Sequence, residues 1–189
     1  MKRIIFLIGV MTLLVAMAGI VQASPISTDN WYRFQFGGTG SFGSSGSPGM
    51  GSGGTAYLGA PTPAWEFTIA QNYLFIVTDA FKYGDEFEVF NSGSSIGITP
   101  VVADINGPAP EINDPVLALL DPGFSSASFL LGPGSYSMTI QVTDSPWGAG
   151  GAFFKLAEPS PVPEPATMLL LGSGLVGLVG YGRKKFFKK

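Results

Sequence analysis

The sequence contains neither cysteine nor histidine. This excludes disulfide bonds, thiolate and imidazole metal ligands, and every catalytic pair that depends on a histidine or a cysteine. A domain without these residues must rely on apolar packing, and about 140 residues are enough for that. Two carboxylates can still catalyse glycoside hydrolysis, but thirteen Asp and Glu residues make some suitable pair unavoidable, so their presence indicates nothing. We therefore predict that the protein is not an enzyme.

Positive charge is scarce between the two ends of the chain. Two of the ten Lys and Arg residues open the sequence, five close it, and three lie between them, at Arg33, Lys82 and Lys155. All thirteen acidic residues lie within 29–164, so three cations stand against thirteen acids there, a net charge of −10. Because nucleic-acid binding needs Lys and Arg to replace phosphate counterions, we exclude nucleic acid as a partner.

The first residues are typical of a secretory signal peptide. Lys2 and Arg3 precede an apolar run over 4–21, and Val21 and Ala23 are the small residues of a cleavage step. We expect the general secretion machinery to export the chain, and residues 1–23 to form a signal helix removed between Ala23 and Ser24. The alternative is a retained membrane anchor, for which the apolar run is just long enough.

The last residues predict a marginal membrane helix over 166–182. Its 16 uncharged residues from 166 to 181 would span roughly 24 Å at 1.5 Å per residue, less than a hydrocarbon core of about 30 Å. Pro163 and Pro165 prevent an outward extension of this helix and leave Pro163-Glu164-Pro165 accessible. A basic tail would stay on the cytoplasmic side: Arg183, Lys184, Lys185, Lys188 and Lys189. This order favours a temporary hold for processing, with a permanent single-span anchor as the alternative.

The succession of Val162-Pro163-Glu164-Pro165, a glycine-interrupted apolar run and a basic tail resembles the PEP-CTERM sorting signal. Such tails occur on exported proteins of Gram-negative bacteria. The resemblance implies that an exosortase in the inner membrane cuts near the Pro-Glu-Pro step, and that the protein passes to the cell surface or extracellular matrix. It also implies an association with extracellular polysaccharide and the biofilm matrix. It covers residues 159–189 and assigns a route, without an activity.

Between the two ends, short stretches alternate apolar and polar residues with a period of two, as half-buried strands do. The alternation is clearest over 136–142, whereas 73–77 is apolar on both faces, as expected for a central strand. The expected strands are 31–36, 65–69, 73–77, 87–90, 96–98, 127–131, 136–142 and 152–156. For residues 24–158 we therefore predict an all-β fold, an antiparallel β-sandwich or jelly roll.

The segment 37–54 contains nine glycines in 18 residues and predicts a flexible loop, because it has little apolar surface to offset its ordering entropy. Residues 38–43 match the pattern G-x-G-x-x-G. The serines, glycines and proline that follow will not form the helix that a dinucleotide site requires, so we exclude nucleotide binding.

Two segments, 73–90 and 137–156, share a Val-Thr-Asp step followed by a loop and a strand. Asp79 and Asp144 thus end equivalent strands and would lie on one rim, with Asp85 on the loop beside them. Since Ca²⁺ takes oxygen ligands from loops, these three residues are a candidate calcium site. The alternative is that Asp79 and Asp144 cap turns with their own side chains.

Trp147 is the candidate for contact with a glycan, because it lies between Pro146 and Gly148 in an expected loop. Trp31 and Trp65 lie in expected strands, where tryptophan usually packs in a core. We therefore predict a non-catalytic, exported surface or matrix protein. The alternative is a carbohydrate-binding module for extracellular polysaccharide, which Ca²⁺ would assist. No other cofactor is expected.

Overall fold

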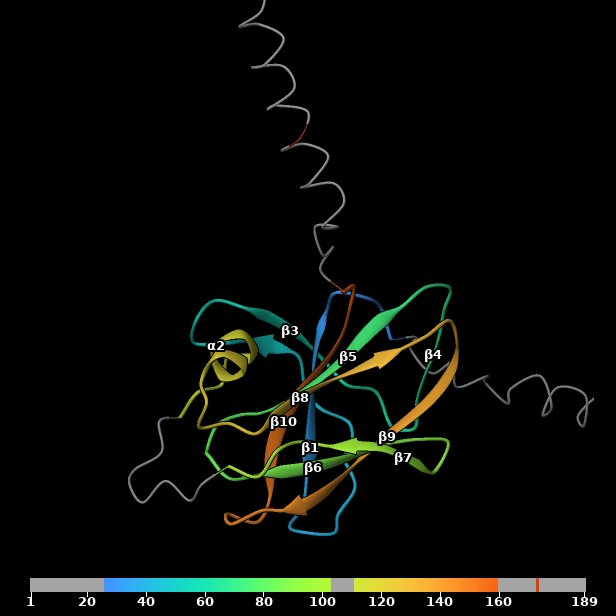
Figure 1. Cartoon of the computed structure of the whole chain (residues 1–189). Helices are drawn as coiled ribbons and strands as arrows, with labels where there is room; N and C mark the ends of the chain where they lie inside the picture. The colour runs from blue at the N-terminus through green and yellow to red at the C-terminus, as the bar shows by residue number, and fades with distance from the viewer. Residues whose placement is uncertain (1–25, 103–110, 160–172, 174–189) are drawn as a thin grey trace, which may run out of the picture. The chain divides into compact units, whose positions relative to one another are not determined.

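The computed structural model describes residues 26–102, 111–159 and 173, and these form two β-sheets with a short helix (Figure 1). The six-stranded sheet has the order β2-β3-β1-β10-β5-β8, and the four-stranded sheet the order β4-β9-β6-β7. The elements are β1 (Trp31–Phe36), β2 (Gly49–Met50), β3 (Ala56–Gly59), β4 (Trp65–Ile69), β5 (Tyr73–Asp79), β6 (Glu86–Asn91), β7 (Ser94–Ile98), α2 (Pro115–Leu120), β8 (Ser126–Leu131), β9 (Gly134–Asp144) and β10 (Gly150–Ala157). The prediction of a mostly β fold is confirmed.

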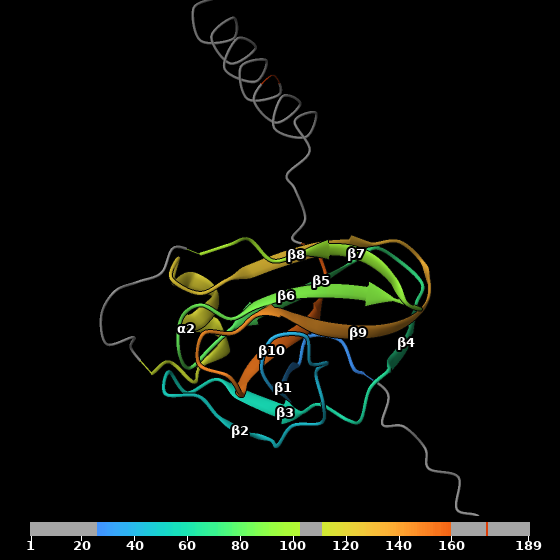
Figure 2. The ribbon, with the colours of Figure 1, turned by 90° about the horizontal axis from the view of Figure 1, so that it is seen from below.

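The two sheets pack face to face, and β6 and β9 lie in front of β1 and β10 in Figure 2. Neighbouring strands are antiparallel except β1 and β3, which run parallel with Tyr32 opposite Leu58. Two sheets over a shared apolar layer are the arrangement of a β-sandwich. Each strand expected from the alternation of residues is present, whereas the short strands β2 and β3 were not foreseen.

Aromatic side chains connect the two sheets. The ring of Trp65 on β4 lies 5.6 Å from that of Phe34 on β1 and 4.5 Å from that of Phe154 on β10, measured between centroids. Burial of a side chain of this size contributes about 1.5–3 kcal/mol. Further members of this layer are Phe75, Phe87, Met138, Ile140 and Val142. The period-two alternation over 31–36, 65–69 and 136–142 therefore predicted the inward-facing residues of β1, β4 and β9 correctly.

The six-stranded sheet is covered on its outer face as well. Trp31 and Phe153 point to that face and pack in a second apolar cluster with Ala118 of α2, which lies at one end of the sheets in both views (Figures 1 and 2). Asp114 begins α2 by accepting hydrogen bonds from the backbone N–H groups of Val116 and Leu117, at 3.0 and 3.2 Å. Six residues are too few to show a helical period, so the sequence alone did not indicate this helix.

The glycine-rich segment 37–54 is not a free loop, which corrects the prediction. The backbone N–H groups of Gly40 and Gly43 donate to the carbonyl oxygens of Val142 and Ile140, both at 2.8 Å. Since β4 pairs with β9 over 134–138, this segment extends the edge of the sheet to the next part of β9. Glycine serves here to let backbones approach closely, a use that composition does not distinguish from flexibility.

Several predictions concern residues outside the described ranges. These are the signal peptide 1–23 with its Ala23–Ser24 step, the sorting step at Val162–Pro165, the basic tail, and the membrane helix 166–182 apart from Ser173, which is helical. Within the described ranges no helix is long and apolar enough to cross a membrane. The chain divides into two compact units, 1–158 and 159–189.

Candidate functional site

Two loops meet at one end of the sheets and hold Trp147 at the surface. Loop 80–85 joins β5 to β6, and loop 145–149 joins β9 to β10. Trp147 donates from Nε1 to the carbonyl oxygen of Tyr83 at 3.0 Å, and Lys82 Nζ lies 4.7 Å from the centre of the indole ring. Gly84 has a φ of 110°, which favours glycine in this turn. Trp147 nevertheless remains 56% exposed, so the loops leave much of its surface available to a ligand.

A cavity of about 240 Å³ opens beside Trp147. The residues that line it include Arg33, Lys82, Asp85, Glu111 and Trp147, which come from four separate parts of the chain. Gly150 and Gly151, the first residues of β10, also line the cavity, and as glycines they carry no side chain. A Cβ at Gly150 would lie 3.2 Å from Asp85 Oδ2, and one at Gly151 would lie 3.3 Å from Arg33 Nε. Successive residues of a strand face opposite sides, so Gly151 leaves space beside Arg33 on the outer face of β10, and Gly150 leaves space beside Phe36 and Asp85 on the inner face.

Arg33 reaches this cavity from the outer face of β1. Its guanidinium carbon lies 4.9 Å from the centre of the Phe81 ring, and Phe81 in turn stacks on Phe153 at 6.1 Å. Arg33 Nε is buried and has no hydrogen-bond partner. A buried donor without a partner costs roughly 1–3 kcal/mol, so this atom would gain from an acceptor supplied by a ligand.

Asp79 and Asp85 form a pair of buried acids, of which Asp85 lines the cavity. Asp79 Oδ1 accepts a hydrogen bond from the Ala80 N–H at 2.6 Å, and its Oδ2 accepts one from the Asp85 N–H at 3.2 Å. Burial, together with the negative charge of Asp85, raises the pKa of Asp79 to about 9. Burial also raises the pKa of Asp85 to about 6, with a contribution from the charge of Asp144. Asp85 is 3% exposed, and its Oδ1 has no hydrogen-bond partner.

The structure gathers the predicted site residues at this corner but does not arrange them as a metal site. Asp144 accepts a hydrogen bond from the Ser145 N–H at 2.9 Å and thereby caps its turn, while Asp79 bonds to the backbone of its own loop. In the described ranges no group of three or more His, Cys, Asp or Glu residues could hold a metal ion. These hydrogen bonds agree with the turn-capping alternative for Asp79 and Asp144, and the calcium site at Asp79, Asp85 and Asp144 stays a prediction without geometric support.

No pattern in the sequence indicated Arg33, Lys82 or Glu111 as site residues. Arg33 lies in a strand and Lys82 in a loop far along the chain, and no local pattern relates them to Trp147. A signal was nevertheless present, since Arg33 and Lys82 are two of the three cations between the ends of the chain. In so acidic a segment, each remaining cation was a candidate for a specific contact.

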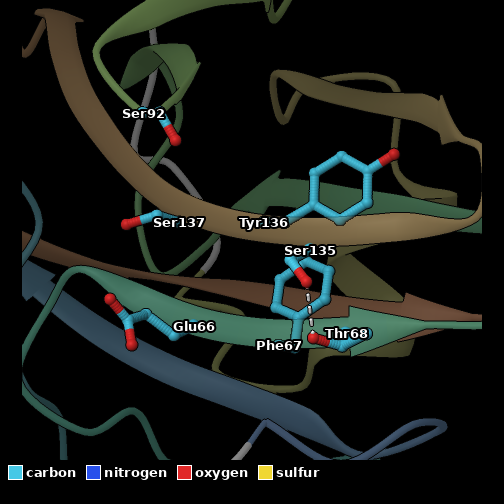
Figure 3. Close-up of a pocket in the computed structure, with 7 residues that line it drawn as sticks. All are labelled: Glu66, Phe67, Thr68, Ser92, Ser135, Tyr136 and Ser137. Carbon is cyan, nitrogen blue, oxygen red and sulfur yellow. Dashed lines mark hydrogen bonds between the residues drawn. The ribbon is translucent and has the colours of Figure 1, made fainter.

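A second, more open cavity of about 560 Å³ lies over β4, β9 and the turn after β6. Figure 3 shows its lining, in which Thr68 Oγ1 and Ser135 Oγ are joined by a hydrogen bond of 2.9 Å. Its residues are Glu66, Phe67, Thr68, Ser92, Ser135, Tyr136 and Ser137. Glu66 is the charged member of this set, and none of the seven has a buried polar atom that lacks a partner. The cavity beside Trp147 is therefore the stronger candidate for specific binding.

Comparison with known proteins concerns the end of the chain. The family model of the PEP-CTERM protein-sorting motif matches residues 161–185, which contain the Pro163-Glu164-Pro165 step and the first cations of the basic tail. No curated protein and no solved structure matches the chain. The resemblance that the sequence analysis drew from the last residues is confirmed.

Proposed function

Because the chain is a PEP-CTERM protein, we propose that it is an exported, non-catalytic protein of the cell surface or extracellular matrix. The motif at 161–185 carries this proposal, since it implies sorting by an exosortase-type enzyme and an extracellular destination. In this proposal the segment 166–182 holds the chain transiently in the inner membrane. Cleavage near Pro163-Glu164-Pro165 then separates the β-rich body, residues 24–158, from the C-terminal tail, residues 166–189.

The lack of a catalytic role is supported by composition. Without histidine or cysteine, the protein has no imidazole base and no thiolate nucleophile. Both carboxylate oxygens of Asp79 accept hydrogen bonds from its own loop, so this buried acid serves the fold. A passive or adhesive role in the matrix agrees with these features.

Replacing Pro163, Glu164 and Pro165 together by alanine should abolish processing at the C-terminal end. Alanine removes the rigid, accessible step and allows the membrane helix to extend outward. Intact-mass spectrometry of protein from the native cells would then give a mass that includes residues 166–189, in the membrane fraction. The control is Pro159→Ala, which lies outside the matched residues and should be processed normally. Normal cleavage of the triple variant would contradict the proposal.

The cavity beside Trp147 favours a second candidate function, the binding of extracellular polysaccharide. An exposed indole can pack against the C–H face of a sugar ring, and sugar hydroxyls need both donors and acceptors around them. Here Arg33 and Lys82 provide donors, whereas Asp85 and Glu111 provide acceptors. This combination supports a carbohydrate-binding role for the body of the protein.

Trp147→Ala is expected to weaken binding to the polysaccharide of the native matrix by about tenfold, the loss of roughly 1.4 kcal/mol of ring packing. A pull-down with purified matrix polysaccharide and the full chain, kept in solution by a detergent without sugar groups, measures this. Phe42→Ala is a matched control, because Phe42 is another exposed aromatic residue, at 53%. If the polysaccharide retains the unchanged chain, Trp147→Ala and Phe42→Ala equally, the cavity beside Trp147 is not the binding site.

A further inference from the structure

The cavity beside Trp147 is lined by most of the cationic residues of the β-rich region described by the structure. The described residues include three cationic side chains, Arg33, Lys82 and Lys155, and two of them line this cavity. Lys155 Nζ lies 3.7 Å from Asp29 Oδ1, and this salt bridge involves neither of the other two cations. The segment between the ends carries a net charge of −10, so two cations at one cavity, beside Asp85 and Glu111, form a local exception to acidic surroundings.

The polar atoms of the cavity are arranged for a ligand with a carboxylate and hydroxyl groups. Arg33 Nε is buried and lacks a partner, and a Cβ at Gly151 would lie 3.3 Å from this nitrogen and 3.4 Å from Nη2, so the glycine leaves space beside the guanidinium. A guanidinium binds a carboxylate through parallel hydrogen bonds. Asp85 Oδ1, which is buried and also without a partner, is an acceptor suited to a hydroxyl group.

We propose that this cavity binds an acidic sugar, a uronate unit of a polysaccharide. Arg33 and Lys82 bind the carboxylate, Asp85 and Glu111 accept hydrogen bonds from ring hydroxyls, and Trp147 packs against the ring. A neutral sugar would offer the two cations no negative charge of its own, whereas an inorganic anion would use neither the acids nor the indole. The proposal deepens the carbohydrate-binding role and rests on it.

Polygalacturonate and its methyl ester are the probes, since they present the same sugar ring with and without the negative charge. Calorimetry with the full chain in a polyoxyethylene ether detergent should show binding of polygalacturonate that is about tenfold or more tighter than that of the ester. Arg33→Gln and Lys82→Gln should each remove most of this preference, because they weaken binding of polygalacturonate far more than binding of the ester. Lys155→Gln is the matched control, because it deletes the same charge at the salt bridge with Asp29.

The outcomes distinguish failure of the carbohydrate-binding role from failure of the preference for an acidic sugar. If the unchanged protein binds neither probe, both the carbohydrate-binding role and the acidic preference fail. If it binds both probes equally and Trp147→Ala loses both, carbohydrate binding stands and the preference for an acidic sugar is wrong. If Lys155→Gln weakens binding of polygalacturonate as much as Lys82→Gln does, the polysaccharide is attracted by overall charge, and the cavity is not its binding site. Since Lys82 lies in a loop, its replacement tests the site even if Arg33→Gln impairs folding.

Discussion

Replacing Asp79 by asparagine is expected to flatten the dependence of stability on pH between about 6 and 9. The pKa of Asp79 is about 9 in the folded protein, against an ordinary value of 3.8, because burial and the nearby charge of Asp85 disfavour ionisation. The folded state therefore binds this proton more tightly than the unfolded state does. The resulting stability is fully present below pH 3.8 and is lost as the pH rises through 9.

The size of this effect is set by linkage. Each such group lowers the free energy of unfolding by at most about 1.4 kcal/mol per pH unit over the interval between its two pKa values. Asp85, with a folded pKa of about 6, contributes the same sign of slope at lower pH. We thus expect stability to fall from acidic to alkaline pH, most steeply where both groups act.

Urea unfolding of the full chain at several pH values, followed by tryptophan fluorescence, measures this slope. Asp79→Asn should remove the decline at neutral and alkaline pH, while the part due to Asp85 persists below pH 6. The matched control is Asp144→Asn, since Asp144 is exposed and caps a turn. A slope that Asp79→Asn leaves intact would mean that Asp79 is ionised in the folded protein.

Gly46→Ala is expected to destabilise the fold by about 3 kcal/mol or more, at the upper end of the usual cost of overpacking. The backbone of residue 46 lies between those of Arg33 and Gly59. A Cβ at Gly46 would lie 2.7 Å from the carbonyl carbon of Arg33 and closer still to its oxygen. Since these are backbone atoms, no side chain can turn aside, and the bond from Gly46 N–H to Ala60 O, at 3.0 Å, would be strained.

Gly38→Ala is the matched control, because it lies in the same segment and its added Cβ would have 3.9 Å to the nearest atom, Gly148 Cα. Urea unfolding should show a large loss of stability for Gly46→Ala and little change for Gly38→Ala. If the segment 37–54 were a flexible loop, both variants would be as stable as the unchanged chain. The pair therefore tests the structural correction directly.

The strands could be predicted because a sheet with one buried face imposes a period of two on the sequence itself. Tyr136, Met138, Ile140 and Val142 show this in β9, whose buried residues are the last three of them. Burial of both faces of β5 could also be predicted, since the neighbouring residues Phe75 and Ile76 are both apolar. The cover over the outer face of β5 could not be predicted, because α2 and the residues that pack with it come from other parts of the chain.

The candidate site was predicted in part. Asp85 and Trp147 were identified as candidates and do line one cavity, but their expected roles came from separate hypotheses. Arg33 and Lys82 were missed because a cavity is made by contacts between distant segments, which leave no local pattern. The unpartnered atoms of Arg33 and Asp85 likewise exist only through burial, a property of the assembled structure.

The sequence by itself determined the destination of this protein and the buried faces of its strands, because a sorting motif and a period of two are both local in the chain. Only the tertiary structure decided that glycines in 37–54 serve close backbone contact, that Asp79 is buried beside Asp85, and that Arg33 and Lys82 meet at Trp147. The physical reason is that burial, pKa and cavity shape depend on which distant segments pack together.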